Sequence, residues 1–93
     1  MPAKGEIRDA ARWYRERSPA VAQQFIAETR RALEFLEEFP GAGSAIPYAD
    51  DPQTRRFPIR TFPYQIVFVE LDDILEVVAV AHDQRRPGYW IPR

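Results

Sequence analysis

The hydrophobic period of the chain changes once, across a Pro-, Gly- and Asp-rich stretch from Pro40 to Pro52. Before this stretch, apolar residues recur every three or four positions, which is the spacing of one helix face. After it, they form short runs rich in β-branched and aromatic residues, which are typical of strands. A chain of 93 residues has room for one domain. The sequence therefore predicts a single α+β domain over residues 1–93, with helices first and strands second.

Two helices are predicted before Pro40. The first, over residues 6–17, has apolar side chains at i, i+3, i+4 and i+7, namely Ile7, Ala10, Ala11 and Tyr14. Ser18 can cap the next helix and Pro19 suits its first turn, so a second helix is predicted over residues 19–39. Because the connection between them is so short, the two helices should form an antiparallel hairpin.

Three antiparallel strands are predicted within residues 55–82. The segment Arg55–Thr61 is interrupted by Pro58, which indicates an irregular or edge strand. Tyr64–Leu71 and Ile74–Ala81 are separated by two residues, which is a hairpin connection. Ile74–Ala81 is nearly all apolar, as expected for a central strand that is covered on both faces.

The helical hairpin is expected to pack on one face of this small sheet, which has three strands or slightly more. One face of the last strand is predicted to be wholly apolar, with Leu75, Val77, Ala79 and Ala81 on it. The residues expected between the hairpin and the sheet are Leu33, Leu36, Val77 and Ala79.

Composition excludes several classes of site. The chain has no Cys and a single histidine, which excludes a thiol nucleophile and a metal cluster of several histidines, and no metal or cofactor is expected. No apolar run is long enough for a membrane helix or a signal peptide, so a cytoplasmic protein is expected. The formal net charge is −1, which gives no whole-molecule signature of nucleic-acid binding, although residues 54–93 contain six arginines.

Several different short motifs follow one another along residues 6–93. They begin with Ala11 and Tyr14, then Ala22 and Phe25, then Leu36 with Pro40-Gly41, and continue through Arg55-Arg56, Phe62–Phe68, Ala79–His82, and Arg85, Pro87, Tyr89, Trp90 and Arg93. In this order they resemble the RelE/ParE superfamily of toxins, and they are closer to its ParE branch. Members of the family usually have a strand before the first helix, and this strand is expected to be missing here, where only Met1–Gly5 precede Glu6.

The resemblance implies the toxin of a bacterial type II toxin–antitoxin pair, held inactive in a hetero-oligomer with its cognate antitoxin. ParE-like members inhibit DNA gyrase, whereas RelE-like members cleave mRNA, usually on the ribosome. A nuclease that approaches ribosomal phosphates should be strongly basic, so the mildly acidic chain favours arrest of growth through gyrase. An mRNA endoribonuclease is the alternative, and a degenerate member that only binds its antitoxin is a third possibility.

Candidate functional residues lie in the second half of the chain. If the protein is a ribonuclease, His82 is the candidate general acid or base, with Arg85 and Tyr89 beside it; its other role is to end a strand. Residues proposed to bind the target or partner are Arg55, Arg56, Arg60, Tyr64, Arg85, Arg86, Tyr89, Trp90 and Arg93. The alternatives are a solvated edge strand for the first three arginines and core packing for Tyr89 and Trp90.

Overall fold

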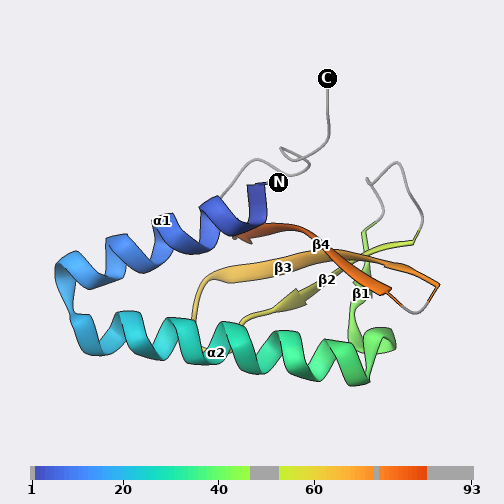
Figure 1. The fold of residues 1–93 in the computed structure, drawn as a ribbon, viewed down its shortest axis with the longest axis horizontal. Helices are drawn as coiled ribbons and strands as arrows, with labels where there is room; N and C mark the ends of the chain where they lie inside the picture. The colour runs from blue at the N-terminus through green and yellow to red at the C-terminus, as the bar shows by residue number, and fades with distance from the viewer. Residues whose placement is uncertain (1, 47–52, 73, 84–93) are drawn as a thin grey trace.

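A computed structural model describes residues 2–46, 53–72 and 74–83 (Figure 1). Helices α1 (Pro2–Arg17) and α2 (Pro19–Glu38) are followed by a short 3-10 helix, η1 (Pro40–Ala42). Four strands come next: β1 (Ser44–Ala45), β2 (Thr54–Pro58), β3 (Tyr64–Leu71) and β4 (Ile74–His82). They form one antiparallel sheet in the order β1-β2-β3-β4. The predicted α+β class is confirmed.

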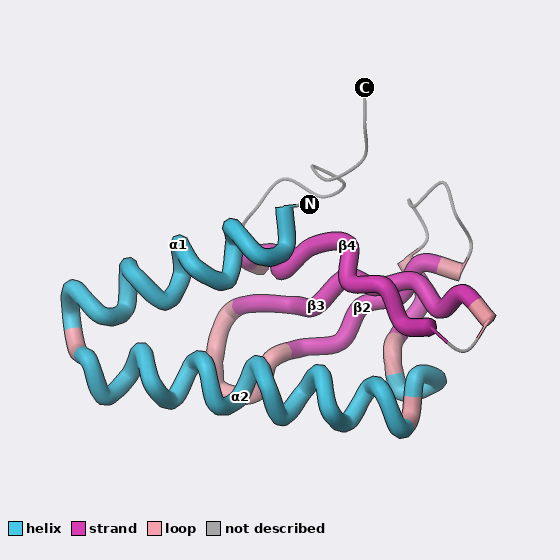
Figure 2. The backbone as a smooth tube through the Cα atoms, viewed as in Figure 1, coloured by secondary structure: helices cyan, strands magenta, loops and turns pink. Residues whose placement is uncertain are grey.

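The helical hairpin forms where the sequence predicts it (Figure 2). Ser18 has extended backbone, and its hydroxyl accepts a hydrogen bond from the backbone N–H of Val21 at 3.4 Å. Pro19 occupies the first turn of α2, where its missing N–H has no helical partner to lose. Helix α1 begins at Pro2, before the predicted start, so no strand precedes it among the described residues.

The main core lies between the hairpin and one face of the sheet. Phe25, Leu36 and Phe68 are fully buried in it, and Leu33 and Val77 pack against it while half-buried. A second, smaller cluster contains Ile46, Val67, Ala79 and Ala81, with Val78 packed against it. The predicted burial of Leu36 is therefore confirmed. The prediction that Ala79 lies between hairpin and sheet is wrong, because Ala79 belongs to the second cluster.

An irregularity in pairing explains this error. Val67 pairs with Ala79 but Phe68 pairs with Val77, so Val78 is an extra residue in β4. The extra residue shifts the alternation of side chains by one position. Leu75 and Val77 consequently pack toward the main core, whereas Ala79 and Ala81 lie in the second cluster. The four residues predicted to share one apolar face are divided between two.

The prediction that the last strand is central is also wrong. Strand β4 is outermost among the described strands, and β3 pairs on both sides. Residues 77–81 of β4 are apolar on both faces because one face contacts the hairpin core and the other contacts the second cluster. An apolar pattern reports whether the faces of a strand are covered, and it does not report whether a neighbouring strand is present.

Strand β2 meets the edge prediction at only one of its ends. At Arg55 and Arg56 it pairs with β1, a two-residue strand that no period in the sequence indicates. At Pro58 no β1 residue pairs with it. The next amide, that of Ile59, donates to the carbonyl of Tyr64 at 2.9 Å, so the Pro58 nitrogen faces away from β3. Proline is thus placed where the sheet has an open edge and no N–H is needed.

Gly43 precedes β1 and provides space for the core. A Cβ at this position would lie 2.5 Å from Cζ of the buried Phe68 and 3.1 Å from Cβ of Arg55. We expect Gly43→Ala to lower the free energy of unfolding by about 1–3 kcal/mol through overpacking. Gly41→Ala is the matched control because nothing lies within 4 Å of its added Cβ. Urea unfolding of both variants measures the difference, and equal stabilities would contradict the packing argument.

Candidate functional site

A cavity of about 520 Å³ lies between α1 and the end of β4 that carries His82. In Figure 1 the start of α1 lies beside this end of the sheet. His82 ends β4 and pairs with Tyr64, the first residue of β3. Their rings meet edge to face with centroids 5.0 Å apart. The described residues that line the cavity are Glu6, Asp9, Ala10, Trp13, Tyr14, Pro63, Tyr64, Val80 and His82.

Glu6 attaches the first turns of α1 to the sheet. Its Oε1 accepts a hydrogen bond from the backbone N–H of Val80 at 2.9 Å. Val80 is nearly fully buried, and its strand is the outermost of the described strands. No neighbouring described strand lies on the side to which this amide points, so Glu6 supplies its hydrogen-bond partner. Leaving a buried N–H unpaired costs about 1–3 kcal/mol. The carboxylate of Glu6 therefore has a structural role as well as a place in the cavity wall.

Aromatic rings form much of the cavity wall. Tyr14 packs against Phe25 and Phe62, with ring centroids 5.4 and 5.2 Å away. Burial raises the pKa of the Tyr14 phenol, which therefore stays protonated at neutral pH. Trp13 is half-exposed, and the guanidinium carbon of Arg17 lies 3.6 Å from the centroid of its ring.

Among the described residues, the side chains in the cavity wall that carry a full charge at neutral pH are the carboxylates of Glu6 and Asp9. No Arg or Lys among the described residues lines the cavity. The carboxylate of Asp83 accepts a hydrogen bond from Nε2 of Gln65 at 3.0 Å. The backbone N–H of Asp83 donates to the carbonyl of Pro63. A phosphate bound in this cavity would share its wall with the carboxylates of Glu6 and Asp9, and like charges repel. In the described part of the chain, no group of three or more His, Asp or Glu side chains is placed to hold a metal ion.

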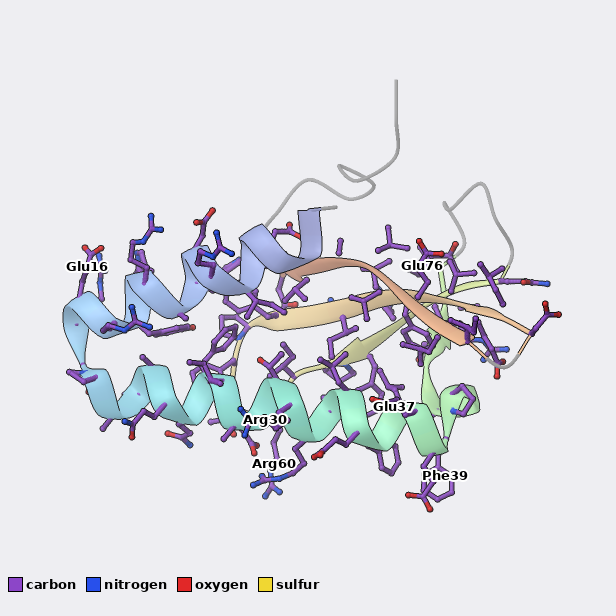
Figure 3. All side chains as sticks on the ribbon, viewed as in Figure 1. Glu16, Arg30, Glu37, Phe39, Arg60 and Glu76 are labelled. Atoms are coloured by element: carbon purple, nitrogen blue, oxygen red, sulfur yellow. The ribbon has the colours of Figure 1, made fainter. Side chains whose placement is uncertain are left out.

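The three arginines predicted near the sheet do not come together. Arg55 and Arg56 are neighbours on β2, so they lie on opposite faces of the sheet, and Nη1 of Arg55 donates to the carbonyl of Gly43 at 3.1 Å. Arg60 lines a separate groove of about 410 Å³ between α2 and β2, with Phe35 and Phe57. Figure 3 shows Arg60 projecting beyond α2, on the side away from α1.

The remaining predicted residues have different outcomes. Tyr64 and His82 share the cavity, as described above. Five of the predicted residues lie outside the described part of the chain: Arg85, Arg86, Tyr89, Trp90 and Arg93. The apolar period of α1 predicts that Asp9 lies on its solvent side, and it indicates no role for Glu6 or Trp13. Their spacing of three and four positions does put all three on one flank of α1, which is the only signal the sequence contains.

Comparison with known proteins settles the family. The family model of the ParE toxin of the type II toxin–antitoxin system, parDE, matches residues 1–87. The chain belongs to the ParE toxin family. No curated protein and no solved structure gives a significant match to it. The predicted resemblance to the ParE branch is confirmed, and with it the role of toxin in a type II system that implies an antitoxin partner. No helix in the described part of this ParE-family toxin is long and apolar enough to cross a membrane.

Proposed function

We propose that this ParE-family toxin arrests growth by binding DNA gyrase in the bacterial cytoplasm, and that its antitoxin neutralises it by binding. The observation that carries the proposal is the charge around His82. The cavity that contains this histidine has Glu6 and Asp9 in its wall and no described arginine or lysine. A ribonuclease needs cationic groups that stabilise the charge developing on phosphate in the transition state, and here the described charges oppose it.

The geometry also favours recognition over catalysis. His82 is held edge-on against Tyr64, and its neighbour Asp83 accepts a hydrogen bond from Gln65. General acid–base catalysis needs a histidine oriented toward the reacting group and a site that attracts the substrate. Inhibition through binding needs neither a base nor a phosphate site. The proposed toxin therefore acts through surface contacts with its target.

The test is the substitution His82→Gln, which keeps a polar side chain of similar size and removes the acid–base group. We expect this variant to keep most of its ability to arrest growth and to inhibit DNA supercoiling by purified gyrase. Cells that express wild type should show inhibited supercoiling and unchanged transcript 5′ ends. Co-expression of the cognate antitoxin should restore growth in both cases.

The opposite result identifies a ribonuclease. In that case wild type cuts mRNA, and a folded His82→Gln variant cuts it about 10²–10⁴-fold more slowly, the usual range for a lost general acid or base. Circular dichroism melts of both proteins exclude unfolding as the cause. A wild type that neither slows growth nor changes supercoiling or transcripts would show a degenerate member and would also contradict the proposal.

A further inference from the structure

The cavity beside His82 has the composition of a receptor for a guanidinium group. Aromatic side chains supply part of its wall, and two carboxylates lie on the α1 side. Asp9 is exposed and Trp13 is half-exposed, so the cavity is accessible from solvent. A cation gains from ring faces and from carboxylates, and arginine uses both because its planar group stacks on rings and forks onto carboxylate oxygens.

The charges on α1 are sorted between its two flanks. Glu6, Asp9 and Trp13 follow each other at three- and four-residue intervals along the flank that lines the cavity. Arg8, Arg12 and Arg15 are exposed and do not line it. Asp9 forms no ion pair with any described residue, so its charge is available to a ligand. This sorting makes the cavity an acidic site on a helix that also contains several arginines.

The chain already shows that one of these rings binds a guanidinium. The Arg17 side chain stacks on Trp13, with 3.6 Å between its Cζ and the ring centroid, while its Nη1 donates to the Trp13 carbonyl at 3.0 Å. Trp13 also meets Tyr14 edge to face, with ring centroids 5.1 Å apart. The indole that lines the cavity is therefore held by two side chains. Binding of a ligand would cost little additional conformational freedom of the Trp13 side chain.

We propose that this cavity binds an arginine side chain presented by a polypeptide partner of the toxin. The guanidinium would lie between Asp9 and Tyr64 and beside the ring of Trp13, on the part that Arg17 does not cover, and Glu6 adds negative charge to the same wall. Glu6 on α1 already occupies the outer edge of β4 at Val80, so a peptide chain would approach the cavity from the solvent-exposed flank of α1 at Asp9 and Trp13. This inference holds whether or not gyrase is the target.

Titration of the full-length toxin with Nα-acetyl-arginine amide tests the inference. The readout is the indole N–H signal of Trp13 in a two-dimensional NMR spectrum, assigned with Trp13→Phe. We expect a saturable shift with the arginine amide and binding at least about tenfold weaker with the uncharged citrulline analogue, since both cation–π and ionic contacts are lost. The lysine analogue should bind between the two.

Substitutions locate the binding site. Asp9→Asn should weaken arginine binding about two- to fivefold, the size expected of one exposed ion pair. Glu34→Gln on α2 removes the same charge outside the cavity and should leave binding unchanged. The proposal is overturned if arginine and citrulline amides shift Trp13 equally, if neither shifts it, or if Asp9→Asn weakens binding no more than Glu34→Gln. Because no toxicity is measured, these results are independent of the identity of the target.

Discussion

Leu36→Ala should lower the free energy of unfolding by about 2–5 kcal/mol, the range for a fully buried leucine that leaves a cavity. Leu36 is 0% exposed and belongs to the cluster in which α2 meets the sheet, together with Phe25, Ile66 and Phe68. Small domains have about 5–15 kcal/mol of stability in total, so the loss is a large share of it. Chemical denaturation with equal m-values for wild type and variant measures the change.

Leu71→Ala is the matched control for this substitution. It removes the same atoms from a leucine that is 45% exposed at the end of β3. We expect a loss of about 0.5 kcal/mol or less there, as at most surface positions. A loss at Leu36 no larger than the loss at Leu71 would contradict the placement of Leu36 between α2 and the sheet.

The parts of the fold that sequence reasoning predicted are those with a strong local signal. The helical hairpin follows from the apolar period and from Ser18-Pro19, whose cap the structure contains. The hairpin of β3 and β4 follows from two apolar runs separated by two residues. Asp72 in this turn has a φ of 54°, in the left-handed region that usually favours glycine. Aspartate tolerates this conformation better than most residues, so the turn forms without a glycine.

The errors arose where the local signal was absent. After Glu76 the run to Ala81 is apolar on both faces, so no polar residue marks the position at which the alternation shifts, and the pattern does not indicate the extra residue Val78. Strand β1 has two residues, too few to show any period. Its partner β2 consequently looked like an edge along its whole length. Strand order depends on long-range pairing, which a period of two does not encode.

The candidate site was harder to predict than the fold because it is formed by distant segments. Glu6 and Val80 are 74 positions apart in sequence and are joined by one hydrogen bond. Polar residues on the outer side of an amphipathic helix usually contact solvent only, so Asp9 gave no reason to expect a cavity. Residue type and family resemblance indicate His82 and Tyr64 as candidate functional residues. Their pairing across β3 and β4 requires the register of the sheet.

Deleting residues 85–93 should abolish toxicity if the toxin acts by binding. The segment contains three arginines, a tyrosine and a tryptophan, which are the residue types that dominate binding energy at protein interfaces. Where such a residue is a hot spot, its loss costs about 2 kcal/mol or more, which is about thirtyfold in Kd. The deletion removes none of the residues that the structure describes, which end at Asp83. Growth on induction and inhibition of gyrase supercoiling are the two measurements.

The deletion has to be separated from a loss of folding. Circular dichroism melts and binding of the antitoxin show whether the shortened protein is intact. Where it is not, two full-length variants answer the same question. These are Trp90→Ala and the double charge reversal of Arg85 and Arg86 to Glu, and we expect each to weaken gyrase inhibition at least tenfold.

A charge reversal on α1 is the matched control for the double variant. Substituting Glu for the exposed residues Arg8 and Arg12 changes the net charge by the same amount and should weaken gyrase inhibition less. Since contacts at an interface are specific to position and bulk charge is not, equal effects of the two reversals would indicate only long-range attraction. Folded variants that arrest growth as wild type does would show that the target contacts lie elsewhere on the molecule.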